Sequence, residues 1–330
     1  MRLISIDEYN HNLMQLAKPI YDKQRRVLLA AGRSIHPVYL GRLKEMDIRY
    51  LFVEDAESSG ITIDEMVDFP TWIDAIETVQ RAFQAAANKE EFPVREVQKL
   101  ALKLAEEVGR RKAIVLVPAS TLAEELRDFA HAVNTALLSL KLAKKRQVSQ
   151  RQIRDLAVGA LLHDIGKAIA ENGEDHAKEG FEFLRKRREI SLLSAHMSYQ
   201  HHEHADGSGS PRGLEGSQIH EFAQICGISN MYDNLISKDG MPPHEAMEYM
   251  MAKSGTVFTI ELVKQFVQEV PSYIPGSKVL LNNGRKAIVT KILKSLQRPF
   301  IRYLDTGVEI SLAEHHTLLI SGIIEGEGLY

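Results

Sequence analysis

The sequence predicts a mainly α-helical protein with a small α/β unit at its N-terminus and a small β module at its C-terminus. Three observations support this fold class. Apolar residues recur at three- and four-residue intervals through much of residues 70–270, which is the spacing of amphipathic helices. Short runs rich in aromatic and β-branched residues stand near the start of the chain. After Pro271, short β runs alternate with turn pairs such as Asn283-Gly284, a strong hairpin signal.

Composition limits the classes of protein to consider. The 330 residues suffice for two or three domains with ample core, and 44% hydrophobic residues exclude a largely disordered chain. A formal net charge of -3 implies no general nucleic-acid binding. The single cysteine, Cys226, excludes a disulfide framework and a cysteine-rich zinc site. No apolar run approaches the roughly 20 residues that span a bilayer, and no signal-peptide core is present, so we expect a cytoplasmic protein without a membrane span.

Polar and Pro/Gly-rich stretches divide the chain into four expected segments. In the first, strands near residues 26–30 and 49–53 flank a short helix at 36–46. We expect a small α/β unit at 1–60, a helical connector at 61–118, the main helical domain at 119–270, and a small β-barrel-like tail at 271–330.

The segment 61–118 carries two apolar stripes of helical spacing, over residues 73–83 and 97–108. Two such helices either link the neighbouring domains or offer a surface for a homodimer. A connector is the interpretation that we favour, with a homodimer as the alternative.

Two helices at the start of the main domain bring polar residues to an apolar surface. A long amphipathic helix is expected over 119–145, with His131 beside its apolar stripe. The next helix has a buried face through Leu161 and is expected to continue through His163-Asp164, with Gly166 as its stop.

Three later helices carry further polar residues. One is expected to open at His176, and a second, over 192–202, ends at His201-His202. A third, over 218–235, has an inward stripe that ends in Asn230 and Asp233. Because buried polar groups need partners, a metal cluster is a specific explanation for this pattern.

Histidines are the unusual feature of the composition. Seven of the 13 fall between His131 and His204. Neutral imidazoles and carboxylates are ligands for divalent transition metals, and a carboxylate such as Asp164 can bridge two ions. Two metal ions held in this way activate a water molecule and bind a phosphoryl group between them.

The ordered set of these residues resembles the HD superfamily of metal-dependent phosphohydrolases, and within it the HD-GYP subfamily. The matches span about residues 119–270 and include the run His201-His202-Glu203 and the turn Gly209-Ser210-Pro211. The resemblance implies an all-helical domain that binds two or three iron, manganese or similar ions and hydrolyses cyclic di-GMP or a related cyclic dinucleotide in bacterial signalling. We expect two ions here.

The resemblance also implies roles for individual residues. Asp164, as the bridging ligand, and Lys167, near the scissile phosphate, would be catalytic. Lys167, Gly209 and Arg212 would contact substrate. The expected metal ligands are His131, His163, Asp164, His176, His201, His202 and Asn230.

Several positions depart from the family pattern. Ser210 stands in place of the tyrosine in Gly-Tyr-Pro, and Asn230 in place of the last aspartate ligand. Asp239-Gly240-Met241-Pro242 stands where Arg-Pro-Tyr-Arg often holds substrate phosphates, and Arg127 where trinuclear members have a glutamate. An amide is a weaker donor than a carboxylate, so we expect Asn230 to be a weak or outer donor and Asp233 to orient a ligand histidine.

Three functions follow from this pattern. The first is a phosphodiesterase on a cyclic dinucleotide. The second is a catalytically weak signalling module that binds a nucleotide or a partner protein. The third is an HD phosphohydrolase on another small phosphate substrate. The nearly complete ligand set favours an enzyme, whereas the departures at Asn230 and residues 239–242 favour the binding module.

Overall fold

The computed structural model describes residues 1–111, 115–146, 148–170, 175–293 and 295–324. Its contacts divide the chain into two compact units. The mixed unit comprises Met1–Asp64, Ser120–Glu125 and Val270–Tyr330, and the helical unit comprises Glu65–Ala119 and Leu126–Glu269. Whether the four predicted segments fold as separate domains stays a prediction.

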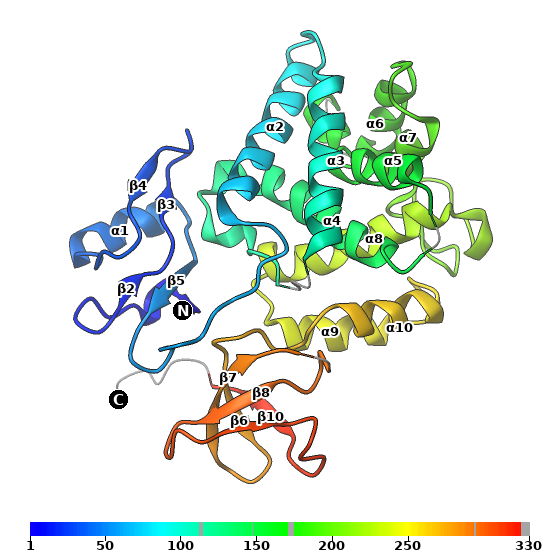
Figure 1. Ribbon diagram of the computed structural model, residues 1–330. Helices are drawn as coiled ribbons and strands as arrows, with labels where there is room; N and C mark the ends of the chain where they lie inside the picture. The colour runs from blue at the N-terminus through cyan, green and yellow to red at the C-terminus, as the bar shows by residue number, and fades with distance from the viewer. Residues whose placement is uncertain (112–114, 147, 171–174, 294, 325–330) are drawn as a thin grey trace. The chain divides into compact units, whose positions relative to one another are not determined.

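The helical unit contains nearly all the long helices and confirms the predicted fold class (Figure 1). None of the helices in the described ranges combines the length and the hydrophobicity that a membrane span requires. The helices are α2 (Phe69–Ala87), α3 (Val94–Arg110), α4 (Arg127–Ala143), α5 (Gln150–Leu161), α6 (His176–Arg185), α7 (Leu192–Gln200), α8 (Glu221–Asp233), α9 (Pro243–Ala252) and α10 (Ile260–Glu269).

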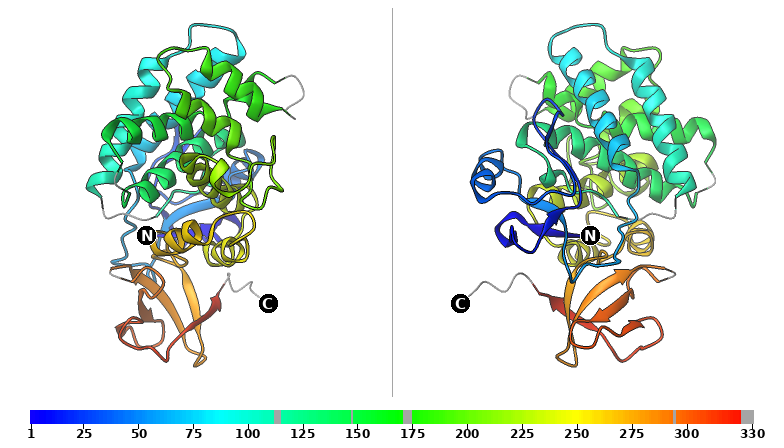
Figure 2. Two further views of the ribbon diagram at one scale, coloured as in Figure 1. Left: turned by 90° about the vertical axis from the view of Figure 1, so that its right-hand side faces the viewer. Right: turned by 60° about the vertical axis from the view of Figure 1, so that its left-hand side comes forward.

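Helix α4 is the centre of this unit. Every residue from Ala130 to Ala143 is buried, and the helix packs against α2, α5 and α8 (Figures 1 and 2). A helix that is buried all round must be surrounded by other elements. Polar residues on α4, such as His131 and Asn134, are therefore confined to the interior and need partners there.

The predicted helix over 119–145 is too long at its start. Residues Ala119–Thr121 and Glu124–Leu126 form short 3-10 turns instead. The backbone N–H of Ala119 donates to Ser237, and that of Glu124 donates to the carbonyl of Met46. A helix that started at residue 119 would need the N–H of Glu124 to donate to the carbonyl of Ser120. Because this N–H donates to Met46 instead, α4 begins only at Arg127.

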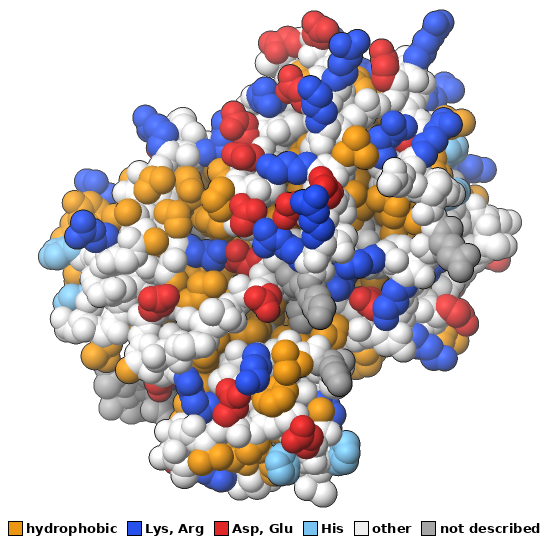
Figure 3. All heavy atoms as spheres, viewed as in Figure 1, with side chains coloured by type: hydrophobic (Ala, Val, Ile, Leu, Met, Phe, Trp, Pro, Cys, Tyr) orange, Lys and Arg blue, Asp and Glu red, His pale blue; other side chains and the backbone are white. Residues whose placement is uncertain are grey.

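From Glu65 on, the predicted connector is part of the helical unit. The apolar stripes of α2 and α3, including Ile76, Val79 and Leu104, are buried by packing against α4 and α5. The homodimer through 61–118, given above as the alternative, therefore loses the observation that suggested it, because the chain itself covers these stripes. On the face drawn in Figure 3, basic and acidic side chains are interspersed over α2 and α3.

The N-terminal part of the mixed unit has the predicted strands and helix. Its three-stranded antiparallel sheet has the order β1-β5-β2, and a hairpin of β3 and β4 precedes α1 in sequence. Apolar residues of these elements form one core. The bounds are β1 (Arg2–Ser5), β2 (Gln15–Leu16), β3 (Ile20–Tyr21), β4 (Val27–Leu29), α1 (Pro37–Glu45) and β5 (Tyr50–Glu54).

The C-terminal part of the mixed unit is an antiparallel five-stranded sheet in the order β10-β6-β7-β8-β9, with its own apolar core. Within the described residues no ladder closes β9 onto β10, so by hydrogen bonding this sheet is open. The strands are β6 (Lys278–Leu281), β7 (Lys286–Lys291), β8 (Phe300–Tyr303), β9 (Glu309–Ser311) and β10 (Ile320–Ile323).

Candidate metal centre

The His163-Asp164 pair lies after a helix and not within one. Helix α5 ends at Leu161, and Asp164 precedes a 3-10 turn, Ile165–Ala168. Gly166, predicted as a helix stop, lies inside this turn and has a packing role. A Cβ at Gly166 would overlap the backbone carbonyl of His176, so the missing side chain lets the start of α6 approach Asp164.

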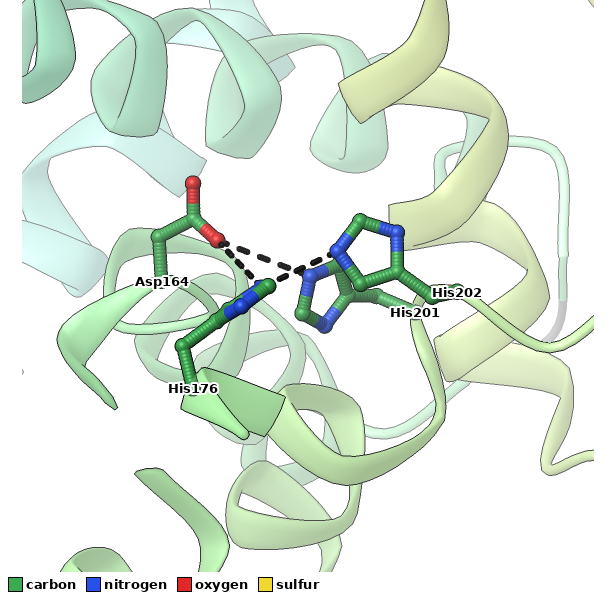
Figure 4. Close-up of side chains that lie close together, drawn as sticks. All are labelled: Asp164, His176, His201 and His202. Atoms are coloured by element: carbon green, nitrogen blue, oxygen red, sulfur yellow. Dashed lines mark hydrogen bonds and ion pairs between the residues drawn. The ribbon is translucent and has the colours of Figure 1, made fainter. Parts of the chain in front are cut away.

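Four side chains form a group on one side of the site. Ligand atoms of Asp164, His176, His201 and His202 all lie within 4.8 Å of one another (Figure 4). The Nε2 atoms of His176 and His201 are each 3.5 Å from Asp164 Oδ1, and the Nε2 atoms of His176 and His202 are 3.0 Å apart. Helix α6 begins with His176, and His201 and His202 directly follow the end of α7.

A second group shares the same carboxylate. His131 of α4, His163 and Asp164 also have ligand atoms within 4.8 Å of one another. The Nε2 of His163 is 3.4 Å from Asp164 Oδ2. The structure therefore brings together the five predicted ligand histidines, with Asp164 in both groups.

The spacing of these atoms fits a metal ion. Two donors at about 2.1 Å from one ion lie about 3.0 Å apart at a right angle and about 3.4 Å apart at the tetrahedral angle. The measured separations of 3.0–3.5 Å fall in this range. Among the described residues, three buried atoms of the cluster have no hydrogen-bond partner: His163 Nε2, Asp164 Oδ1 and His201 Nε2. Because buried polar atoms normally have partners, these atoms fit a ligand role.

The backbone holds two of the histidines in the tautomer that a metal ligand needs. Nδ1 of His163 donates to the carbonyl of Ala160 at 2.8 Å, and Nδ1 of His201 donates to the carbonyl of Ser198 at 2.9 Å. A proton on Nδ1 leaves the lone pair of Nε2 directed into the cluster.

The electrostatics of the site favour the same ligand forms. Burial lowers the pKa of His201 to about 4, and burial together with the charge of His201 lowers the pKa of His202 to about 2. Burial alone would raise the pKa of Asp164, but the neighbouring His163, His201 and Lys167 outweigh it and hold that pKa well below its usual value. At neutral pH, His201 and His202 therefore offer neutral imidazoles and Asp164 offers an ionised carboxylate.

Asn230 and Asp233 both contact His131. Asp233 Oδ2 accepts from His131 Nδ1 at 2.7 Å, while Asn230 Oδ1 lies 2.8 Å from His131 Nε2. Burial opposes charge on His131, but the hydrogen bond and charge of Asp233 outweigh burial and raise the pKa of His131. Asn230 thus lies on one ring nitrogen of His131 and Asp233 on the other. Their roles toward a metal stay predictions.

The predicted substrate-binding residues have different surroundings. The ammonium of Lys167 pairs with Asp164 Oδ2, and its side chain is 46% exposed. Gly209 packs so closely on the backbone of His202 and His204 that a Cβ would overlap it. Arg212 is exposed.

The loop that carries Gly209 and Arg212 is held by a residue for which the sequence suggested no role. The buried carboxylate of Glu203 accepts from the backbone N–H of Arg212 at 2.9 Å and of Leu214 at 2.8 Å. The run His201-His202-Glu203 contains this residue, but nothing in the run indicates that its carboxylate faces the backbone of a later loop.

Asn134 is a second residue that the sequence did not single out. It is buried on α4, one turn after His131, and its amide donates to Asp233 Oδ1 at 2.9 Å. Asn134 could have been identified from the sequence, because it is a polar residue three positions after a candidate ligand on a strongly apolar helix.

Comparisons with known proteins indicate the family of this chain. Residues 98–261 match the family model described as "HD domain". The chain is 28% identical over 181 residues to a cyclic di-GMP phosphodiesterase of Pseudomonas aeruginosa, covering 49% of this chain and 44% of that protein. It is 25% identical over 166 residues to 3'3'-cGAMP-specific phosphodiesterase 2 of Vibrio cholerae, covering 44% of this chain and 32% of that protein. The chain thus spans less than half the length of these curated relatives.

A solved structure shares the fold. The HDG"Y"P protein of Bdellovibrio bacteriovorus superposes with a TM-score of 0.50 at 18% identity, over 80% of this chain and 97% of that one. This likeness concerns the fold. By the matched family model, the chain belongs to the HD family through residues 98–261.

Proposed function

We propose that this chain is a metal-dependent phosphodiesterase that hydrolyses cyclic di-GMP or a related cyclic dinucleotide in bacterial signalling. The observation that carries the proposal is the pair of ligand groups that share Asp164. The proposal is supported by relatives whose names specify phosphodiesterases of cyclic di-GMP and of 3'3'-cGAMP.

The cofactor that we propose is a pair of divalent transition-metal ions, with iron or manganese as the first choice. One ion would be held by His131, His163 and Asp164, the other by Asp164 with the remaining histidines of the cluster. Imidazole and carboxylate donors suit such ions. The chemistry that a pair of ions supplies when bound is activation of water and neutralisation of charge on a phosphoryl group.

The side chains of this protein would orient and bind. Each oxygen of Asp164 faces a different part of the cluster, since Oδ1 lies near His176 and His201 while Oδ2 lies near His163. Lys167 pairs with this carboxylate and is partly exposed, so its ammonium can reach a phosphate from solvent.

The test is metal analysis followed by a turnover assay. Protein purified without oxygen is expected to carry near two ions per chain and to linearise cyclic di-GMP or 3'3'-cGAMP, seen as a linear dinucleotide by chromatography. Asp164→Ala is the inactive control. A metal-free protein, or a metal-loaded one that leaves cyclic dinucleotides intact and cleaves another small phosphate ester, contradicts the proposal.

A second candidate is a cyclic-dinucleotide binding module with little turnover. The contact between Asn230 and the Nε2 atom of His131 favours it, because an amide there is a weaker donor than a carboxylate. Residues 239–242 also lack the arginines that hold phosphates in the family. Calorimetric binding of cyclic di-GMP without product over hours would favour this candidate over the enzyme.

A further inference from the structure

A chain of buried hydrogen bonds leads from α2 to the candidate metal ligand His131. The indole Nε1 of Trp72 donates to Asn134 Oδ1 at 2.9 Å, and Asn134 Nδ2 donates to Asp233 Oδ1 at 2.9 Å. The other oxygen of Asp233 accepts from His131 Nδ1 at 2.7 Å. Trp72 and Asn134 are 1% and 0% exposed, so bulk water does not compete for these bonds.

The chemistry of the partners allows only one orientation of the Asn134 amide. An indole N–H can only donate, and a carboxylate can only accept. The amide oxygen must therefore face Trp72 and the amide nitrogen must face Asp233. A flipped amide would place a donor against a donor and an acceptor against an acceptor, so that buried polar groups on both sides would lose their partners.

The backbone just before Ser120 holds the same chain at two points. The carbonyl of Val117 accepts from Asn134 Nδ2 at 3.0 Å. The N–H of Ala119 donates to the hydroxyl of Ser237, which in turn donates to Asp233 Oδ1 at 3.0 Å. Asp233 thus accepts hydrogen bonds from His131, Asn134 and Ser237, and its position is determined by α2, α4 and the segment 115–119 together.

We propose that Trp72 and Asn134 are positioning residues for the metal site of His131, His163 and Asp164, and that they act by holding Asp233 against His131. A partner on the second ring nitrogen fixes the direction and the basicity of a ligand histidine. The inference rests on the metal site of the proposed function and does not depend on its substrate. It concerns one of the two ions, since the chain reaches His131 and none of the histidines at 176, 201 and 202.

The protein has a single tryptophan, so its fluorescence reports on this chain directly. The experiment is a titration of metal-free protein with Zn²⁺, which has no redox chemistry and suits nitrogen and oxygen ligands. In the natural protein, one of two binding steps is expected to change the emission of Trp72. In Asn134→Leu, which breaks the chain but keeps a buried side chain of similar size, most of that change is expected to be lost.

Metal affinity gives a second, independent measurement. In equilibrium dialysis, Asn134→Leu and Trp72→Phe are each expected to bind one of the two Zn²⁺ ions about 10-fold more weakly and the other ion with unchanged affinity. A factor of about 10 is at the lower end of what is lost when a residue that hydrogen-bonds to a metal ligand is replaced. Thr135→Val is the matched control. Its hydroxyl is buried on the same helix and has no hydrogen-bond partner in the part of the chain that the structure describes, so both ions and the fluorescence change should persist.

Two results overturn the inference alone, and a third overturns it together with the proposed function. Zn²⁺ binding without a change in Trp72 emission, or normal affinity for both ions in the two variants, would show that the chain does not position the site, while the proposed function would stand. Absence of any Zn²⁺ binding by the natural protein would overturn both. Circular dichroism checks that the variants are folded. If Asn134→Leu does not fold, the dialysis measurement on Trp72→Phe still tests the inference, because this variant keeps an aromatic ring and loses the hydrogen-bond donor.

Discussion

At the scale of the single residue, Asp164 is the side chain that joins the two ligand groups. We predict that Asp164→Ala removes both ions, because each group loses its only carboxylate. Metal content should fall from near two to near zero, while circular dichroism keeps the helical signal. Asp128→Ala, which removes an exposed carboxylate of α4, is the control and should retain both ions. Two ions still bound in Asp164→Ala would contradict the bridging role.

Lys167 allows metal binding and substrate binding to be separated. Its ammonium pairs with Asp164, a carboxylate that also belongs to both ligand groups. Lys167→Met is expected to keep or tighten metal binding, because a competing positive charge is removed. Turnover should fall about 10–100-fold, the value of a charge-assisted contact to phosphate.

The measurements for Lys167→Met are equilibrium dialysis of the metal and steady-state kinetics with a cyclic dinucleotide. Lys178→Met changes an exposed lysine of α6 and should leave both unchanged. Unaltered kinetics in Lys167→Met would rule out a phosphate contact.

Asn230 and Asp233 should respond in opposite directions. Asn230→Asp places a carboxylate beside His131 Nε2, so we predict metal binding that is tighter by about 10-fold, equivalent to about 1.4 kcal/mol. Asp233→Asn removes the carboxylate on His131 Nδ1 and should weaken metal binding by roughly 10–100-fold. Dialysis against radioactive metal measures both. If both substitutions changed the affinity for metal in the same direction and by the same factor, Asn230 and Asp233 would not differ in their position relative to the ion.

At the scale of the element, Gly166 sets the distance between the turn after α5 and the start of α6. Gly166→Ala would drive a Cβ into the backbone of His176, and since backbone cannot rotate away, α6 must shift. We predict that the ion of the group containing His176 is lost while the helical content persists. Metal analysis should give near one ion per chain.

A second glycine serves as the control for Gly166→Ala. Gly109 lies in α3, and a Cβ added there would meet no described atom from outside its own turn of helix within 4 Å. Gly109→Ala should therefore keep both ions and be neutral or stabilising by up to about 1 kcal/mol. Two ions retained in Gly166→Ala would contradict the prediction, because His176 would then still bind its ion after α6 has shifted.

At the scale of the whole molecule, the ligands come from α4, α6, α7 with the residues that follow it, and the turn after α5. Ions that bind only the folded chain stabilise it by about 2.7 kcal/mol at a free concentration 100 times Kd. We predict that removal of the ions by a chelator lowers the Tm of the helical unit by about 5–10 °C, and that readdition restores it. Calorimetry measures the shift, and Asp164→Ala should show none. An equal chelator effect on Asp164→Ala would assign the stabilisation to another site.

Much of the fold could be predicted from the sequence because periodicity is a local property. The helices at 69–87, 94–110 and 176–185 and the strands after Pro271 follow from apolar spacing and turn residues. The start of α4 could not be predicted this way. Ala119 and Glu124 give their backbone hydrogen bonds to Ser237 and Met46, residues far away in the sequence.

The sequence by itself determined which residue types gather at the site, since histidines and one aspartate in a fixed order indicate the cluster and the HD family. Only the tertiary structure decided how they are held. The sharing of Asp164 by two groups and the approach of α6 at Gly166 are properties of packing. The chain from Trp72 to His131 joins residues that are 62, 99 and 102 positions apart at its successive bonds. The physical reason is that a buried polar group must find its partner in space, and the partner's position along the chain leaves no local pattern.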